Sequence, residues 1–536
     1  GQLNYLDVVD GGDGTDTVST ANAAIVASVL GGLSNVEKLT QTAAGTITLS
    51  ENVGPTNFVL TADSAQNITF NDDYSQATTV TILGDTDSTD TVTNNSNIDL
   101  TVVAYSSDFV EANTTITGSA TSTDSIVMYA NGDGDWDTDS AATITGIDNL
   151  TINSTIGLTG AYSAATTMDL GPIATPITVV SNLSALDGTL TLDFDQAGSV
   201  YGTVNYTGGA NIDSIKLGTL NDTIDSGAGN DIITSGTGVN TINTGAGVDT
   251  INMGTGVDII DAGAGNDIIK AGASDLLAND VIVGGDGNDT LEFLATGYTD
   301  ESVFSGLSGV ERIKGTAAND TDQALPMNGN LDVTIIDASG VSDTIVTFKA
   351  GYTNATTVEL GAADTDNKDE IVNGGAANAN IDLTVTATDA DVFKSTTIIT
   401  GGTGTDTITI TNTAAGTAVL TNATYIDVLN IIDYTSGVDV EITGGANAAT
   451  PLTVNATTMD AGEILTGNFA AATGGVTMNA GAGADILTGG ASADTIYGNA
   501  GIDTIDGNEN SATLGADAIY GGAGNDIINV TDAETE

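Results

Sequence analysis

The sequence predicts an all-β protein in which elongated, parallel β-roll or β-solenoid segments alternate with Thr-rich β modules, in two tandem copies. Segments rich in Thr, Val and Ile recur throughout the 536 residues, whereas no stretch keeps a 3.6-residue apolar period over four turns. Residues 96–118 align without a gap with residues 379–401, which indicates an internal duplication. Each copy closes with a run of short glycine repeats, a pattern typical of stacked coils.

The strand prediction depends on β-branched side chains, which pack well on a pleated surface. The clearest such segments are 46–50, 78–83, 98–104, 189–195, 331–337 and 381–388. The nearest approach to a helix is the short segment 21–37.

A smaller module recurs inside each copy. A glycine-aspartate turn is followed 21 to 24 residues later by an acidic residue between apolar neighbours, as in Asp16 with Glu37 and Asp289 with Glu311. We therefore predict six domains: a β module with an isolated turn (1–117), a second β module (118–207), a first roll (208–292), a repeat of the first module (293–400), a repeat of the second module (401–479) and a second roll (480–536).

The composition excludes several classes of function. The chain has 71 acidic and 8 basic residues, a formal net charge of −63, and neither cysteine nor histidine. Disulfide scaffolds, thiolate or imidazole zinc sites and His-dependent hydrolases are therefore excluded. Nucleic-acid binding needs a basic stripe, and membrane insertion needs a long apolar run, so we expect neither. Because 40% of the residues are hydrophobic, the chain should still bury a core.

The two glycine runs carry the chemistry. Residues 208–270 form seven consecutive nonapeptides, with an apolar residue at every eighth position and an acidic or amide residue at every sixth. Six residues rich in Gly and Asx favour a turn, and the remaining three form a short strand. Two nonapeptides then make one coil, so carboxylates 18 residues apart stack on one edge, about 4.8 Å apart. The sixth-position carboxylates are Asp213, Asp222, Asp231, Asp249, Asp258, Asp267, Asp280, Asp289, Asp485, Asp494, Asp503, Asp517 and Asp526.

Stacked carboxylates repel one another unless a cation lies between them. A hard cation with six or more oxygen ligands, held by aspartate oxygens and glycine carbonyls, would turn this repulsion into cohesion. Calcium fits better than magnesium because carbonyl-rich turns form a larger and less regular cage. We therefore expect several Ca²⁺ ions. Flexible linkers, the alternative interpretation of the glycine runs, do not explain the strict phase of the repeats.

This nonapeptide, GGxGxDxUx, resembles the calcium-binding β-roll of the RTX (repeats-in-toxin) proteins. The resemblance implies that the sixth-position aspartates supply carboxylates and that the protein is exported. It also implies that glycines at positions two and four sit where their carbonyls face the ion. Examples are Gly227, Gly229, Gly245, Gly247, Gly254 and Gly256.

Some positions depart from the repeat. Asn240 occupies a sixth position and puts its site in doubt, and the insertions at 271–274 and near 509–513 should bulge out of the coil.

Isolated turns leave two interpretations open. Asp16, Asp124 and Asp406 either bind calcium or simply turn a strand. The acidic segment 131–140, with Asp133, Asp135, Asp137 and Asp139 around Trp136, is either a solvated loop or a single calcium loop.

The alternation of rolls with Thr-, Ala- and Asn-rich modules, with landmarks such as LSNVEKL (33–39) and LSGVERI (307–313), resembles bacterial S-layer proteins of the Caulobacter RsaA-like type. The resemblance implies a structural protein that is exported by a type I system and joins copies of itself into a calcium-dependent lattice on the cell surface. It also implies cell-surface polysaccharide as a partner, through a region outside this chain.

Two other classes of function compete with the lattice. An adhesin or biofilm matrix fibre would join the same subunits end to end through Ca²⁺. An enzyme acting on acidic polysaccharide would need a carboxylate pair. Such pairs occur by chance among 71 acids, and aromatic residues make up only 4% of the chain, so we do not expect an enzyme.

Overall fold

The structure is a computed structural model of the whole chain. It describes residues 2–50, 54–61, 65–82, 90–105, 115–119, 122–129, 143–145, 149–153, 166–168, 178–182, 190–193, 203–210, 212–272, 274–294, 301–315, 323–327, 331–339, 344–348, 352–361, 369–373, 381–388, 392–412, 416–433, 440–443, 451–508 and 516–529.

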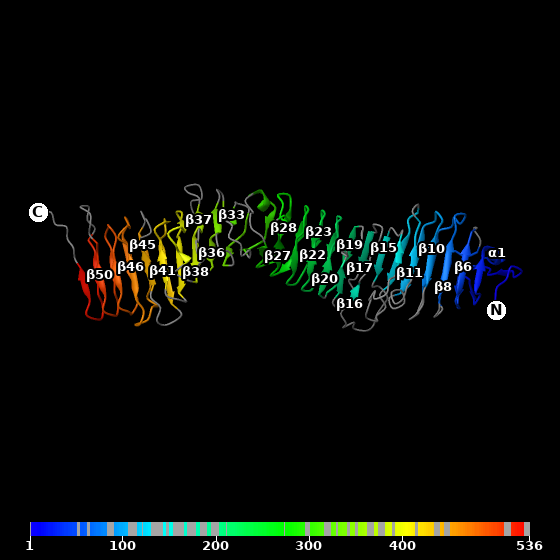
Figure 1. The fold of residues 1–536 in the computed structure, drawn as a ribbon, viewed down its shortest axis with the longest axis horizontal. Helices are drawn as coiled ribbons and strands as arrows, with labels where there is room; N and C mark the ends of the chain where they lie inside the picture. The colour runs from blue at the N-terminus through cyan, green and yellow to red at the C-terminus, as the bar shows by residue number, and fades with distance from the viewer. Residues whose placement is uncertain are drawn as a thin grey trace. The chain divides into compact units, whose positions relative to one another are not determined.

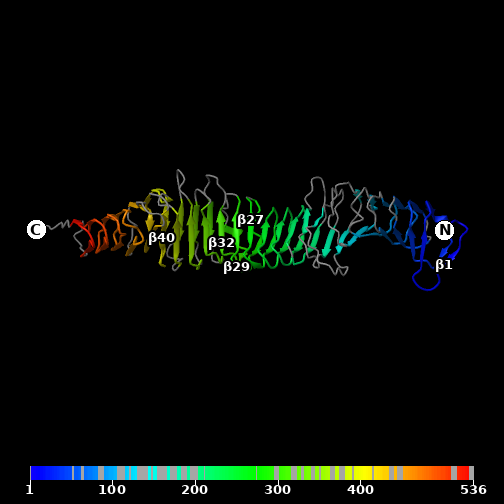
Figure 2. The same ribbon diagram turned by 90° about the horizontal axis from the view of Figure 1, so that it is seen from below.

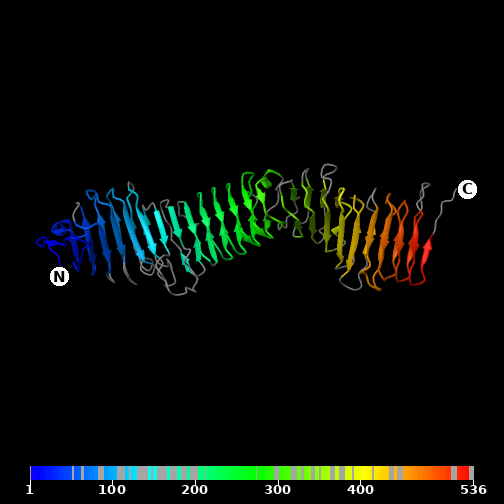
Figure 3. The ribbon, with the colours of Figure 1, turned by 180° about the vertical axis from the view of Figure 1, so that it is seen from behind.

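The chain forms two compact units, Gly1–Ile268 and Ile269–Glu536. In both units the strands stack as successive coils, and the described strand pairs are all parallel, such as β21 with β23 and β36 with β38. Figure 1 shows β6, β8 and β10 as neighbours in this stack, and Figure 3 shows the same coils from behind. The all-β fold class with parallel solenoid coils is therefore confirmed.

Unit 1 has one long sheet and two shorter ones. In the long sheet, neighbouring strands are two or three elements apart in the chain, because each coil also places a strand in a second sheet. The long sheet contains β2 (Thr17–Thr20), β5 (Lys38–Gln41), β7 (Asn57–Leu60), β9 (Thr78–Ile82), β11 (Leu100–Tyr105), β13 (Ser125–Tyr129), β15 (Asn149–Asn153), β17 (Thr178–Asn182), β19 (Val204–Thr207), β21 (Thr223–Asp225), β23 (Thr241–Asn243) and β25 (Ile259–Asp261).

The alternate strands of unit 1 form the two shorter ladders. The first contains β3 (Ala24–Val26), β6 (Gly45–Leu49), β8 (Gln66–Phe70), β10 (Thr91–Asn94), β12 (Thr115–Thr117) and β14 (Thr143–Thr145). The second contains β16 (Thr166–Met168), β18 (Leu190–Asp193), β20 (Asp213–Lys216), β22 (Ile232–Thr234) and β24 (Thr250–Asn252). The remaining elements are β1 (Val9–Asp10), α1 (Ala27–Leu30), β4 (Leu33–Ser34) and β26 (Ala264–Gly265).

Unit 2 is built in the same way, and Figure 2 shows β32 and β40 of its long sheet from below. That sheet contains β30 (Thr290–Phe293), β32 (Arg312–Gly315), β34 (Ile335–Ala338), β36 (Thr356–Leu360), β38 (Leu383–Ala387), β40 (Thr407–Asn412), β43 (Val428–Asp433), β45 (Leu452–Asn455), β47 (Val476–Asn479), β49 (Thr495–Tyr497) and β51 (Ala518–Tyr520).

Two shorter ladders complete unit 2. The first contains β33 (Gln323–Met327), β35 (Thr344–Phe348), β37 (Glu370–Asn373), β39 (Ile398–Thr400) and β42 (Ala423–Thr424). The second contains β41 (Gly416–Val419), β44 (Val440–Thr443), β46 (Leu465–Asn468), β48 (Ile486–Thr488), β50 (Thr504–Asp506) and β52 (Ile527–Asn529). The remaining elements are β27 (Ile268–Ala271), β28 (Val281–Val283), β29 (Asp286–Gly287), η1 (Glu301–Phe304) and β31 (Leu307–Ser308).

The core is a stack of apolar side chains, one from the middle of each short strand. In the first roll the eighth-position residues Ile224, Ile233, Ile242 and Ile251 are at most 1% exposed. Aromatic side chains take this place in the Thr-rich coils, where Phe58 and Phe70 pack edge to face with ring centroids 6.0 Å apart. Among the described residues, no helix is long and apolar enough to cross a membrane.

Each predicted strand segment overlaps an observed strand, and the segment 21–37, the nearest approach to a helix, contains the four residues of α1. The sequence did not indicate that the Thr-rich modules are themselves coils of the solenoid. Their strands join the same ladders as the roll strands, as β17 pairs β19 and β19 pairs β21. The boundaries of the six predicted domains stay predictions.

Candidate metal centre

The glycine-aspartate turns have a backbone conformation that suits glycine. In the first roll many glycines at the second and fourth positions of the nonapeptide lie at positive φ, such as Gly227 at 98°, Gly229 at 138°, Gly245 at 89° and Gly247 at 149°. L-residues avoid this region because of their Cβ atom. In the second run Asn499 takes the second position at φ 68°, which asparagine tolerates.

Successive turns also lie too close together for a side chain. A Cβ atom on Gly247 would lie 1.4 Å from the carbonyl oxygen of Gly229 in the preceding coil, and one on Gly245 would lie 1.9 Å from that of Gly227. Gly254 and Gly256 meet carbonyl oxygens of the preceding coil in the same way, each at 1.6 Å, although Gly254 is not at positive φ. The glycine carbonyls therefore point along the stack from one coil to the next.

Sixth-position carboxylates of the roll accept backbone hydrogen bonds from the coil before them. The Oδ1 atom of Asp249 accepts the backbone N–H of Asp231 at 2.7 Å, and the Oδ1 atom of Asp231 accepts that of Asp213 at 2.8 Å, both across 18 residues. The predicted 18-residue coil, with its stacked carboxylates, is thus confirmed. On the other edge Asp222 accepts the N–H of Val204 at 2.7 Å.

The same hydrogen bond explains the acidic landmarks outside the rolls. Glu37 accepts the N–H of Asp16 at 2.8 Å, and Asp427 accepts that of Asp406 at 2.9 Å. Asp124 accepts the N–H of Leu100 at 2.9 Å. These Thr-rich coils therefore repeat the hydrogen bond of the roll with a longer spacing, a role of the acidic landmarks that their sequence pattern did not reveal.

The predicted sites differ in the hydrogen bonding of the second carboxylate oxygen, Oδ2. In one group the Oδ2 atom is buried and has no hydrogen-bond donor, which is costly for an ionised carboxylate. This group includes Asp16, Asp222, Asp231, Asp249, Asp485 and Asp503.

Burial raises the pKa of the roll carboxylates in this group, Asp222, Asp231, Asp249, Asp485 and Asp503. Desolvation raises the pKa of Asp222 to about 6 against the hydrogen bond from Val204, which lowers it. The pKa of Asp485 also rises to about 6, mainly through desolvation. The pKa values of Asp231 and Asp249 are raised from the usual value by the same cause. These carboxylates lack the positive charge that would stabilise their ionised form.

A second group has its Oδ2 atom satisfied within the protein. Tyr206 donates its hydroxyl to Asp213 at 2.9 Å, and the backbone N–H groups of Gly402 and Gly490 donate to Asp406 and Asp494, each at 2.6 Å. In the segment that follows the insertion at 271–274, Asp280 accepts the N–H of Leu277 at 2.5 Å.

Three further predicted carboxylates form the coil-to-coil hydrogen bond. Asp267 accepts the N–H of Asp249 at 2.7 Å, Asp517 that of Asp494 at 2.9 Å, and Asp526 that of Asp503 at 3.1 Å. Asp289 is buried and donates its own N–H to Glu311 at 2.9 Å.

The isolated turns differ from one another. Asp16 follows Gly12 and Gly14, which lie at φ 88° and 132°, so its turn has the glycine conformation of the roll. Gly402 and Gly404, before Asp406, are not in the left-handed region. The acidic segment 131–140 lies outside the described residues, as do 509–513 of the second insertion.

The oxygen atoms in these turns fit the ligand preference of a hard cation. Buried carboxylate oxygens without donors lie beside turns whose carbonyls point along the stack, and oxygen ligands of these two kinds are what calcium prefers. No group of three or more acidic side chains among the described residues could hold a metal by itself. Carbonyl oxygens would therefore have to join the carboxylates in any calcium site.

Comparison with known proteins agrees with this chemistry. Both runs match the family model described as RTX calcium-binding nonapeptide repeat. The matched residues are 207–242, 217–251, 253–275, 277–293, 477–510 and 511–531. A search of curated proteins found no match. The repeats therefore identify calcium-binding segments of the RTX type, which are typical of secreted proteins, within a longer solenoid.

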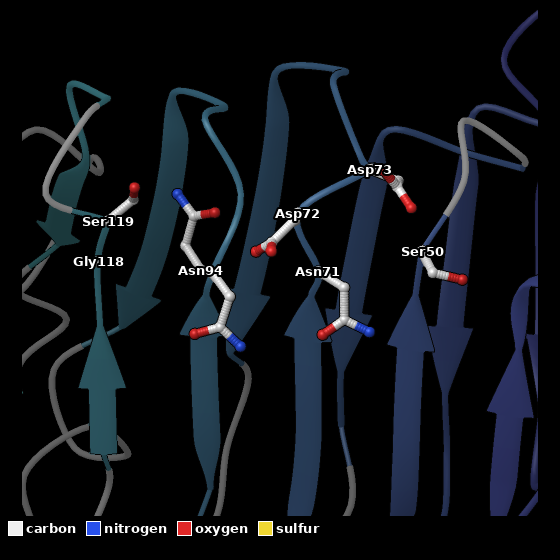
Figure 4. Close-up of a pocket in the computed structure, with 8 residues that line it drawn as sticks. Ser50, Asn71, Asp72, Asp73, Asn94, Gly118 and Ser119 are labelled. Atoms are coloured by element: carbon white, nitrogen blue, oxygen red, sulfur yellow. The ribbon is translucent and has the colours of Figure 1, made fainter.

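A polar pocket of about 740 Å³ lies away from the rolls, and no sequence motif had indicated it. Figure 4 shows it along the turns that follow β6, β8, β10 and β12. Its lining is Ser50, Asn71, Asp72, Asp73, Asn94, Asn95, Gly118 and Ser119. The only available signal was a polar residue after each of these strands, which a turn also requires.

Proposed function

We propose that the chain is a calcium-dependent structural protein of the cell surface that assembles with copies of itself into an S-layer lattice. The observation that carries the calcium dependence is the set of buried Oδ2 atoms without donors in turns that match RTX repeats. The S-layer assignment is supported by the acidic, cysteine-free composition and by the alternation of rolls with Thr-rich coils.

Asp222, Asp231, Asp249 and Asp503 would hold ions together with glycine carbonyls of neighbouring coils. When bound, calcium supplies the positive charge that these oxygens lack and links one coil to the next. The Oδ1 atoms keep their backbone hydrogen bonds, so each aspartate contributes one oxygen to the ladder and one to the ion.

This division couples folding to calcium concentration. Without calcium, stacked carboxylates and a net charge of −63 oppose compaction of the rolls. Extracellular calcium, about 10⁻³ M, suits the weak affinities of extracellular modules. Binding energy then becomes folding energy, as in other metal-dependent domains. The rolls would therefore complete their folding after export.

Electron microscopy of the purified chain, with calcium and after chelation, tests the assembly. We expect a periodic sheet with calcium and dispersed particles without it. Single filaments would instead support an adhesin or matrix fibre. Particles that stay dispersed at every calcium concentration would overturn self-assembly.

A pair of variants separates calcium binding from net charge. Asp231→Asn with Asp249→Asn removes two of the buried carboxylates, whereas Asp225→Asn with Asp261→Asn removes two exposed ones from the same roll. We expect only the first pair to lower the number of bound ions and to weaken assembly. Equal effects of the two pairs would assign the calcium dependence to surface charge.

A further inference from the structure

The two edges of the first roll differ at one level. On the edge that precedes β20, β22 and β24, the sixth positions of successive coils are all aspartates, including Asp231 and Asp249. On the edge that precedes β21, β23 and β25, Asn240 stands between Asp222 and Asp258. Asn240 is fully buried, so its amide must find partners within the protein.

Both polar atoms of the Asn240 side chain form hydrogen bonds within the roll. Its Oδ1 atom accepts the N–H of Asp222 at 3.0 Å, which is the coil-to-coil hydrogen bond of the aspartates. Its Nδ2 atom donates to the carbonyl oxygen of Ser235 at 3.1 Å and to the Oδ1 atom of Asp258 at 3.0 Å. The amide thus joins a carbonyl of its own turn to the carboxylate of the next coil.

The neighbouring carboxylates show what this amide replaces. At Asp222, Asp231 and Asp249 the second oxygen is buried and has no donor. At Asp258 the hydroxyl of Ser235 lies 3.5 Å from Oδ2, while Asn240 and its backbone N–H both donate to Oδ1. At this level the side chains of the roll supply the hydrogen-bond donors that the second oxygens of Asp222, Asp231 and Asp249 lack.

A buried side-chain amide also donates to a carboxylate of the next coil in a Thr-rich coil. Asn94, at the end of β10, is 1% exposed and donates its Nδ2 to both oxygens of Asp124, at 3.0 and 3.1 Å. The same nitrogen also donates to the carbonyl oxygen of Ile98 at 2.9 Å. Here too a buried amide joins a backbone carbonyl to the carboxylate of the next coil.

We propose that the side-chain amides of Asn240 and Asn94 act as built-in substitutes for a cation, so that the coils they join need no calcium. The proposal rests on the proposed calcium binding of the other turns. It assigns Asp124 to a metal-independent turn and leaves the edge of the roll that contains Asn240 with fewer ions than the edge that contains Asp249.

Asn240→Asp tests the proposal because it replaces the side-chain amide with a carboxylate that should bind calcium. We expect this variant to bind at least one more calcium ion than the parent chain, as counted by native mass spectrometry. Asn243→Asp is the matched control, because Asn243 is exposed in the same coil and the charge change is identical. It should bind the parental number of ions.

The converse variant, Asp249→Asn, places an amide on the edge formed by aspartates alone. We expect it to bind fewer ions than the parent. Asp249→Asn should also slow exchange of the Asp231 amide hydrogen, which is bonded to residue 249, in calcium-free buffer. The reason is that an asparagine at position 249 can donate a hydrogen bond, as Asn240 does, whereas the carboxylate cannot. This second readout is independent of the ion count.

The outcomes separate the two proposals. If the parent chain binds no calcium, the proposed function fails. If the parent binds calcium but Asn240→Asp and Asn243→Asp bind the same number of ions as the parent, the calcium function stands and the amide substitution is overturned.

Discussion

The rolls and the Thr-rich coils use the same ladder but different means of holding coils together. In the roll, coils of 18 residues place a carboxylate at every level, and its second oxygen is buried without a donor at Asp222, Asp231 and Asp249. In the Thr-rich coils the spacing is longer, and aromatic pairs such as Phe70 with Tyr74, at 5.2 Å, fill the interior. The difference shows that cohesion between coils depends on what fills each level, and not on the ladder alone.

Removal of calcium should have the largest effect, and it should be local. Amide hydrogens of residues 223–261 should exchange rapidly after chelation because the carboxylates there repel one another, whereas those of residues 54–82 should stay protected. Hydrogen exchange with mass spectrometry measures both regions in one sample. Equal loss of protection in the two regions would show that all coils depend on calcium alike.

The close approach of glycine turns predicts the next largest effect. Gly247→Ala should destabilise unit 1 by about 4 kcal/mol, because the added Cβ would meet the Gly229 carbonyl at 1.4 Å and φ is 149°. Chemical denaturation in calcium measures the loss. Gly462→Ala is the control, because its Cβ would meet nothing within 4 Å. It should change stability little, and equal losses would contradict the close contact.

An aromatic substitution should act without regard to calcium. Phe70→Ala removes a fully buried ring that packs on Phe58 and Tyr74, and should cost about 3 kcal/mol. The loss should be the same with and without calcium, as measured by hydrogen exchange of residues 54–82. Phe70→Leu, which keeps most of the volume, should cost less. A calcium-dependent loss would mean that the two kinds of coil are coupled.

The effect of pH should change sign with calcium. Burial raises the pKa of Asp222 and Asp485 to about 6, above the usual value of 3.8, so the ion-free folded state binds more protons than the unfolded chain between these values. In calcium-depleted buffer, stability should therefore fall as pH rises through about 6. With calcium, acid should lower stability because protons compete for the same oxygens. Thermal denaturation at pH 4.5 and 7.5 measures both, and the same sign in both buffers would argue against these carboxylates as ligands.

The smallest effect should come from the surface of the Thr-rich coils. Arg312 lies 3.2 Å from Asp337 and 2.9 Å from Glu359, and it is partly exposed. Arg312→Gln should cost no more than about 1 kcal/mol at low salt, and less at high salt, because solvent screens the pairs. Denaturation at two ionic strengths measures the change. A loss of several kcal/mol would mean that this ion-pair network, like calcium in the roll, holds its coils together.

Much of the fold was predictable because it is local. In the first roll the central Ile of each nonapeptide recurs with one period and is buried, and glycines such as Gly227, Gly229, Gly245 and Gly247 recur with the same period and lie at positive φ. The Thr-rich coils were harder to predict. Their acidic landmarks were visible, but the hydrogen bond from Asp16 to Glu37 joins residues whose spacing differs from that of the roll.

The sequence alone determined the strand class, the 18-residue coil, the stacked carboxylates and the choice of a calcium-type ligand set, because each follows from residue types at fixed spacing. Only the tertiary structure decided which carboxylates keep a buried oxygen without a donor. Asp213 receives the Tyr206 hydroxyl, Asp124 receives the Asn94 amide, and Asp231 receives the backbone N–H of Asp213 on Oδ1. These partners lie in neighbouring turns and coils at varying spacing, so their meeting depends on how the coils stack and cannot be seen in any single repeat.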